Sequence, residues 1–357
     1  SDLKLTAPPE LTPAFYHWKS EWSFGDSLSQ SLVSEKTYLR NINVRKIYLR
    51  LFDVDWNGAE AVPLATLETA ESLPDSFVWV PTVFITNRTL REIADEKVSS
   101  LALRLNEKIS ATATRLGFSF DEVQIDCDWT LQTREKYFEL LHQLQSHLAE
   151  RGAALSVTIR LHQVKFYQQT GVPPADRGML MFYNMSSVDE AATVNSILDL
   201  AEAEKYMVNF EQYPLALDVA LPIYNWGVLF RDGAMIRLIN NLSPEMLVDT
   251  SRFVPATALN QQIREAIATD LESGSQWYRL RKNTYLDGYY LYAGDLLRLE
   301  WIPAAQLRAA AKLLQRELPP ASRSVAFYHL DNNCLQQHSY ETLEQVLDIF
   351  RKEQLTQ

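Results

Sequence analysis

The sequence predicts an α/β fold, a (β/α)8 TIM barrel with insertions. Eight short segments rich in apolar, β-branched and aromatic residues are mostly separated by segments with helical periodicity, the order expected when helices join parallel strands. The chain has 357 residues, more than the roughly 250 of a typical barrel. No two of its 11 glycines are separated by a single residue. The glycine-rich turn of a doubly wound nucleotide-binding sheet is therefore missing, which favours the barrel.

Strands and helices alternate in the first part of the chain. Segment 46–52 has the alternation of a strand. Gly117 is placed to end the long amphipathic helix that precedes Gly117. A stripe of apolar residues from Phe138 to Leu148 indicates the next helix. The predicted elements are, in order, strand 15–18, helix 29–41, strand 46–52, a polar insertion at 57–75, strand 77–86, helix 89–116, strand 123–129, helix 134–151 and strand 155–161.

The second part contains the remaining three strands. Ser187 and Glu190 have the spacing of a capping box, which predicts a helix starting there. Glycine-containing turns at 231–233 and 292–295 indicate hairpins. We expect a single domain, 1–357, with an insertion at about 227–301 between strands seven and eight. The predicted elements are strand 179–185, the helix from 187, strand 215–224, the insertion, helix 303–318 and strand 325–329.

Composition excludes several classes of function. The chain has 34 Lys and Arg against 45 Asp and Glu, a net charge of −11, so we expect no nucleic-acid partner. No apolar run approaches the ~20 residues that a membrane span needs. The six histidines form no HxH or HExxH motif, so we predict neither a metal site nor a cofactor, although His17, His162 and His329 near strand ends leave a loose metal site open.

Alternation in the fourth strand predicts where its carboxylates point. One face of the strand consists of Val123, Ile125 and Cys127. The other face consists of Gln124, Asp126 and Asp128. The apolar face must pack under helices, because unpaired charges buried there would be very unfavourable. Asp126 and Asp128 therefore point into the barrel, with Asp128 near the C-terminal end where barrel enzymes carry their active sites.

The second and fifth strands are predicted to direct positively charged side chains into the same barrel interior. In the fifth strand the polar face carries Arg160 and His162, and in the second strand the inward residues are Tyr48, Arg50 and Phe52. One interpretation is an ion-pair network of Arg50, Arg160, Asp126 and Asp128 that fills the barrel. The other is a pair of carboxylates whose pKa values are driven apart, as acid–base chemistry requires.

Aromatic residues gather at the predicted C-terminal strand ends. Flat apolar rings beside carboxylates suit a sugar, whose C–H face stacks while its hydroxyls form hydrogen bonds; rings that simply close the barrel top are the alternative. These residues are Trp18, Trp56, Trp129, Tyr183, Trp226 and Tyr328.

Two strands resemble motifs of the chitinase-like family 18 glycoside hydrolases. The segment Val-Gln-Ile-Asp-Cys-Asp-Trp-Thr at 123–130 resembles their DxxDxDxE strand, and Met-Phe-Tyr-Asn at 181–184 is similar to their MxYD. With the Arg-Glu-Lys-Tyr at 134–137 and the segment 217–226, the chain looks more closely like an uncharacterised bacterial family of extracytoplasmic barrel proteins. The resemblance implies that Asp126 and Asp128 are the central carboxylates and that Tyr183 contacts substrate.

The chain departs from the chitinase-like pattern at the position of the general acid. Thr130 stands where the motif has glutamate, Val123 where it has its first aspartate, and Asn184 where the tyrosine motif has aspartate. Threonine cannot protonate a glycosidic oxygen at neutral pH. Asp55, beside Trp56, is the first candidate for a substitute acid, and the other candidates are Asp53, Asp218, Glu211 and Asp331.

Together these observations predict a carbohydrate-active barrel, glycoside hydrolase-like, that acts on an oligosaccharide or polysaccharide. Asp128, Asp126 and Asp55 are the predicted catalytic residues. The predicted substrate-binding residues are Tyr183, Trp18, Trp56, Trp129, Trp226, Arg160, His162 and Tyr328. The alternative is a carbohydrate-binding barrel without catalysis, for which Thr130 is the main evidence. The resemblance implies a secreted or periplasmic location, with a lipid-anchored precursor as one form.

Overall fold

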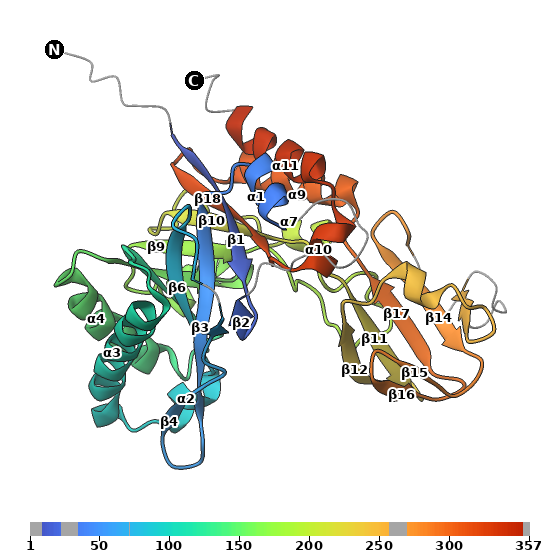
Figure 1. Ribbon diagram of the computed structural model, residues 1–357, viewed down its shortest axis with the longest axis horizontal. Coiled ribbons are helices and arrows are strands. Elements are labelled where there is room, and N and C mark those ends of the chain that lie inside the picture. Colours follow the sequence, from blue (N-terminus) through green and yellow to red (C-terminus); the bar gives the residue numbers. More distant parts are fainter. Residues whose placement is uncertain (1–8, 23–34, 71, 257–269, 353–357) are drawn as a thin grey trace.

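Eight parallel strands close into a barrel in the computed structural model, which describes residues 9–22, 35–70, 72–256 and 270–352 (Figure 1). Each strand pairs with the next along the ring, and a pairing between the first and second strands closes it. The fold is a TIM barrel, as predicted, and all eight predicted strands are present. They are β1 (Leu11–His17), β3 (Lys46–Trp56), β6 (Val78–Ile85), β7 (Glu122–Asp126), β8 (Ala154–Ile159), β9 (Arg177–Met181), β10 (Leu217–Pro222) and β18 (Arg323–Tyr328).

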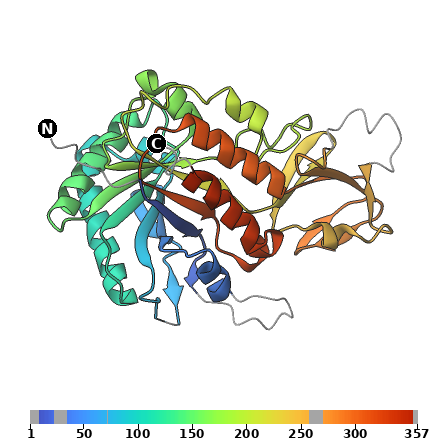
Figure 2. The ribbon, with the colours of Figure 1, turned by 90° about the horizontal axis from the view of Figure 1, so that it is seen from above.

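Helices cover the outside of the barrel, with their apolar stripes against the strands (Figures 1 and 2). Short strands β2 (Glu21–Trp22), β4 (Ala61–Leu64) and β5 (Glu68–Thr69) lie in the loops after β1 and β3. The helices are α1 (Glu35–Asn41), α2 (Asn87–Glu92), α3 (Val98–Leu116), α4 (Arg134–Ala149), α5 (Leu161–Lys165), α6 (Tyr167–Thr170), α7 (Leu200–Glu204), α9 (Ala304–Glu317), α10 (Asn332–Gln337) and α11 (Tyr340–Lys352). The first part of the predicted helix 29–41 lies outside the described residues.

Two helix predictions are wrong. The predicted helix 89–116 is divided into α2 and α3, because Ile93 adopts an extended backbone conformation and its carbonyl accepts a hydrogen bond from Lys136 Nζ at 2.5 Å. No helix begins at Ser187. The carbonyls of Val188 and Glu190 instead accept hydrogen bonds from the Arg298 guanidinium, at 2.8 and 2.6 Å. A long-range partner has replaced the local helical one.

Phe52 points outward, contrary to the prediction. A bulge after Arg50 shifts the register of β3 against β6, so the inward and outward positions exchange beyond it. The ammonium of Lys108, on the outer helix α3, lies 5.1 Å from the centre of the Phe52 ring. The same shift brings the Asp53 carboxylate to Arg50, whose Nε lies 2.7 Å from Asp53 Oδ1.

The segment between β10 and α9 forms an antiparallel sheet beside the barrel (Figures 1 and 2). The predicted turn at 231–233 joins two of its strands as a hairpin, with positive φ at Asp232 and Gly233. The predicted hairpin at 292–295 is only a turn, because the strands on either side of it do not pair with each other. The sheet order is β12 (Ala234–Asn240), β11 (Trp226–Arg231), β17 (Leu296–Glu300), β14 (Ser275–Leu280) and β13 (Phe253–Pro255), and β15 (Thr284–Leu286) pairs with β16 (Tyr289–Leu291).

Polar side chains fill the middle of the barrel and form hydrogen bonds with one another. The Tyr16 hydroxyl donates to the side-chain oxygen Oε1 of Gln124, and Gln124 Nε2 donates to Ser156 Oγ at 3.3 Å. Tyr16 stacks on Tyr48, with ring centres 4.9 Å apart. The predicted inward face of β7 is therefore confirmed, and it continues upward to Asp126.

Candidate functional site

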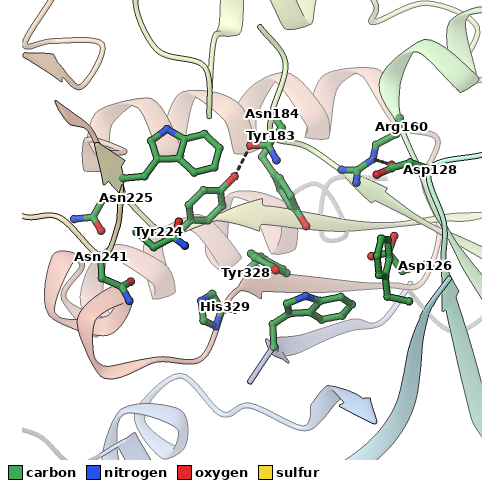
Figure 3. Close-up of a pocket in the computed structure, with 14 residues that line it drawn as sticks. Asp126, Asp128, Arg160, Tyr183, Asn184, Tyr224, Asn225, Asn241, Tyr328 and His329 are labelled. Atoms are coloured by element: carbon green, nitrogen blue, oxygen red, sulfur yellow. Dashed lines mark hydrogen bonds and ion pairs between the residues drawn. The ribbon is translucent and has the colours of Figure 1, made fainter. Parts of the chain in front are cut away.

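A pocket of about 400 Å³ opens at the C-terminal ends of the barrel strands, between the barrel and the inserted sheet. We call it the mouth pocket (Figure 3). It is bounded by Trp18, Asp126, Arg160, Tyr183, Asn225 and Tyr328. A second pocket of about 560 Å³, the side pocket, adjoins it and shares Asp128, Arg160 and Tyr183 with it; Trp129, Thr130 and His162 also line it.

Asp126 is buried at the inner end of the mouth pocket. Its Oδ1 accepts a hydrogen bond from Thr158 Oγ1 at 2.7 Å. Burial raises the pKa of Asp126, although the positive charge of Arg160 and the Thr158 hydrogen bond act in the opposite direction. This carboxyl group therefore holds a proton more readily than an ordinary aspartate.

Asp128 lies at the rim and pairs with Arg160. Arg160 Nε is 2.9 Å from Asp128 Oδ1, and the Asp128 side chain is 61% exposed. Burial acts to lower the pKa of Arg160, but the neighbouring Asp128 and Asp126, together with Tyr183 and the hydrogen bond to Asp128, outweigh it and raise that pKa. Arg160 Nη1 is buried and has no hydrogen-bond partner among the described residues. One donor of this guanidinium thus remains available inside the pocket.

The predicted cations and carboxylates form two separate pairs. Arg50 bonds to Asp53, while Arg160 bonds to Asp128. No hydrogen bond between described residues joins the two pairs into a single network. The Arg50 guanidinium also lies 5.7 Å from the centre of the ring of Trp18, which lines the mouth pocket.

Four predicted aromatic residues line the mouth pocket. The Tyr328 ring is central, with ring centres 5.8 Å from Trp18 and 5.2 Å from Tyr183. Trp226 lies further along the wall, and its Nε1 donates to Glu300 Oε2 at 2.9 Å. These rings form a continuous apolar surface next to the polar groups.

Trp129 and His162 line the side pocket only. Trp129 is 5% exposed and packs against Tyr137 and Phe138 of α4. His162 lies on α5, because β8 ends at Ile159, so it is not an inward strand residue as predicted. Burial and the charge of Arg160 lower the pKa of His162.

Asp55 and Trp56 are not among the residues that line the two pockets. The Asp55 carboxylate bonds to the Arg88 guanidinium, and Thr86 Oγ1 donates to it at 2.7 Å. These hydrogen bonds lower the pKa of Asp55 to about 2. A carboxyl group held ionised in this way is a poor proton donor at neutral pH.

The remaining candidate acids also lie elsewhere. Asp218 is at the opposite end of the barrel, near the start of β10, where Arg177 Nη2 lies 2.8 Å from its Oδ1. Asp331 caps α10 and pairs with Lys19. Glu211 is exposed on a loop. None of these carboxylates lines the mouth pocket.

The structure adds residues that sequence analysis did not select. Tyr224, Asn225, Asn240 and Asn241 line the mouth pocket. His329, which the sequence suggested only for a loose metal site, joins them just after β18. The Tyr224 hydroxyl donates to Asn184 Oδ1 at 2.6 Å. Tyr224 is the last residue of a predicted strand and Asn225 directly follows it, so both could have been selected by position. Asn240 and Asn241 could not, because only the pairing of β12 with β11 brings them there.

Two general features of the described residues bear on function. No group of three or more His, Cys, Asp or Glu side chains among them could hold a metal ion. No helix within the described ranges is long and apolar enough to cross a membrane.

Comparison with known proteins finds the same fold in chitinase-like barrels. No family model matches the chain, and no curated protein matches it. The Bacillus megaterium spore cortex-lytic enzyme SleL has a TM-score of 0.55 at 12% identity, with 96% of this chain and 75% of that chain covered. A chitinase-like agglutinin from Robinia pseudoacacia has a TM-score of 0.52 at 12% identity, with 94% of this chain and 99% of that chain covered. A GH18 chitinase from Cycas revoluta, solved with (GlcNAc)4, has a TM-score of 0.51 at 13% identity, covering 96% and 99%.

These identities are low, so the comparisons establish the fold alone. The barrel closure, the inward Asp126 and the aromatic mouth agree with the resemblance drawn from strands four and six. The chain has the TIM-barrel fold of the chitinase-like glycoside hydrolases.

Proposed function

We propose that the mouth pocket binds an oligosaccharide and that the barrel acts as a glycoside hydrolase. The observation that carries the proposal is a set of buried polar atoms that have no hydrogen-bond partner among the described residues, set among aromatic rings. They belong to Arg160, His329 and Asn225. Buried polar groups are nearly always paired in folded proteins. A ligand with many hydroxyl groups would supply these partners, while its apolar ring face packs on Trp18 or Tyr328.

Asp126 and Asp128 are the proposed catalytic carboxyl groups. Burial raises the pKa of Asp126, which suits a proton donor, whereas Asp128 is exposed and next to a guanidinium, which suits a carboxylate facing positive charge at the sugar carbon. Proton transfer from Asp126 to the glycosidic oxygen would release the leaving sugar, and water would complete the hydrolysis. Arg160 positions Asp128, and Tyr183 and the tryptophans hold the sugar.

A second candidate is carbohydrate binding without hydrolysis. Thr130 lines the side pocket at the position where the chitinase-like motif carries its acid, and a hydroxyl group cannot take over that role. One structural neighbour is named a chitinase-like agglutinin. The binding proposal is common to both candidates, and only turnover separates them.

The Asp128→Asn variant tests the proposal. Wild-type protein is screened for released reducing sugar on a polysaccharide panel, and affinity for the best oligosaccharide is measured by calorimetry. We expect turnover to fall at least 100-fold in the variant while affinity changes less than about threefold, because the carboxylate acts mainly in the transition state. Asp95→Asn is the matched control, since Asp95 is an exposed aspartate that pairs with Lys136 and lines neither pocket.

Each outcome has a definite meaning. Glycan binding without turnover by the wild type supports the second candidate and contradicts hydrolysis. No binding to any member of the panel contradicts both. A secreted or periplasmic location is part of the proposal, and fractionation of cells that express the natural protein tests it.

A further inference from the structure

Asn225 is a buried side chain whose amide group has no partner. It is 2% exposed, and neither Nδ2 nor Oδ1 has a hydrogen-bond partner among the described residues. Asn195 provides the contrast. It is 1% exposed, its Nδ2 donates to three backbone carbonyls, and its Oδ1 accepts from two backbone N–H groups. The protein therefore satisfies one buried amide completely and leaves the other unpaired beside a pocket.

The backbone around Asn225 is held in place. Its carbonyl accepts a hydrogen bond from the Asn241 N–H at 3.2 Å, and the next residue, Trp226, pairs with Asn240 in the inserted sheet. Small movements of the chain therefore do not offer the amide a new partner. A polar group that is fixed, buried and unpaired lowers stability, and such groups recur at binding sites, where the ligand completes the hydrogen bonds.

The surroundings indicate what kind of group would bind. Asn225 and Asn241 lie at the end of the mouth pocket opposite Asp126 and Asp128 (Figure 3). The lining of this end comes from Asn225, Asn240, Asn241, Tyr224 and Trp226, with His329 beside them. Burial lowers the pKa of His329 to about 4, so none of these groups is charged at neutral pH. A carboxamide offers two donors and one acceptor. Uncharged groups that both donate and accept, such as neighbouring hydroxyls, match it, whereas a carboxylate or ammonium group would find no opposite charge there.

Trp226 supplies a fixed apolar face at the same end. Its indole nitrogen is held by Glu300, whose charge is balanced by Arg298 Nε at 2.5 Å. Arg298 and Glu300 are both fully buried, and neither lines the pocket. An aromatic face beside an unpaired amide is suited to a sugar ring, which presents an apolar side and a polar edge.

We propose that Asn225 forms a second subsite of the mouth pocket, which takes an uncharged, hydroxyl-bearing sugar unit away from the carboxylates. The inference rests on the proposed function, because it names the class of ligand at the same pocket. In this arrangement the Asn225 amide selects the sugar unit, and Asp126 and Asp128 act on its neighbour.

The test uses the whole chain and the Asn225→Leu variant, which keeps the side-chain size and removes both polar atoms. Wild-type and variant proteins are applied to a glycan array that carries neutral and uronic-acid oligosaccharides, and the strongest neutral ligand is titrated by calorimetry. We expect the wild type to prefer neutral glycans and the variant to lose at least tenfold in affinity. The melting temperature of the ligand-free variant should equal or exceed that of the wild type, because an unpaired buried amide is removed.

A structural role for Asn225 would give a different pattern. Asn225→Asp is the second variant, because it keeps the shape and adds a charge; it should bind neutral glycans more weakly than the wild type. A melting temperature that falls in the leucine variant, unchanged affinity in that variant, or a wild-type preference for uronic acids overturns the subsite while glycan binding stands. Absence of any glycan binding by the wild type overturns the proposed function and the subsite together.

Discussion

The buried ion pair of Arg298 and Glu300, both on β17 of the inserted sheet, is bonded to the loop after β9 and can be tested by substitution. Both side chains have no exposed surface, and Arg298 Nε lies 2.5 Å from Glu300 Oε1. The other guanidinium nitrogens donate to the carbonyls of Val188 and Glu190, in the loop after β9. The Arg298→Met change keeps most of the apolar stem and removes all three hydrogen bonds.

The hydrogen bonds of the two side chains set the expected loss of unfolding free energy. Removing one partner of a buried pair costs about 3–5 kcal/mol, because the remaining charge is uncompensated. Glu300 keeps donors from the Ser196 N–H and Oγ and from Trp226 Nε1, which favours the lower end of that range. The two carbonyls that lose their donor add about 1 kcal/mol each. We therefore expect the free energy of unfolding to fall by about 5 kcal/mol.

Urea unfolding of the wild type and variant, followed by circular dichroism and tryptophan fluorescence, measures this change. The matched control is Arg104→Met, because Arg104 also pairs with a glutamate, Glu60, but both side chains are largely exposed, at 47% and 64%; we expect a loss of at most about 1 kcal/mol. The double variant Arg298→Met with Glu300→Gln should recover part of the loss by removing the unpaired charge. A loss below about 1 kcal/mol for Arg298→Met, or no recovery in the double variant, would refute the reasoning.

Two further predictions concern stability. Burial lowers the pKa of His17 from 6.5 to about 3 and that of His338 from 6.5 to about 4. Between pH 6.5 and 4 the unfolded state therefore binds more protons than the folded state. The free energy of unfolding should fall as the pH drops below 6.5, by about 2 kcal/mol per histidine at pH 5. Urea midpoints at pH 7.5 and 5.0 measure this fall, and equal midpoints would contradict it. Gly274→Ala should lower the free energy of unfolding by about 4 kcal/mol, because Gly274 has a φ of +78° and a Cβ there would lie 2.1 Å from the Trp301 carbonyl oxygen. Gly233→Ala, at a similar φ but with open space around the new Cβ, should lower it by about 1 kcal/mol. Similar melting temperatures for the two alanine variants would show that the close approach is relieved without cost.

Local patterns were sufficient for the barrel and for the inward position of Asp126. In β7 the apolar residues alternate with Gln124 and Asp126, and only one assignment of faces keeps the carboxylate from an unpaired position under a helix. Aromatic residues at strand ends were likewise correctly placed for Trp18 and Tyr328. These inferences hold because a strand's two-residue period is a property of the chain itself.

Other features depended on partners distant in sequence. The bulge in β3 turned Phe52 outward and Asp53 toward Arg50. No pattern within residues 46–52 predicts this bulge. The capping-box spacing at Ser187 was overruled by Arg298, more than 100 residues later.

The sequence by itself therefore determined the barrel, the interior carboxylate and the aromatic mouth, because alternation and apolar periodicity are local. Only the tertiary structure decided that Asp55 bonds to Arg88 outside the pockets and that Asn225 meets the amide-rich end of the inserted sheet. The folded geometry determines the hydrogen-bond partners of a polar side chain. The local sequence pattern does not show which residue distant in sequence will lie next to that side chain.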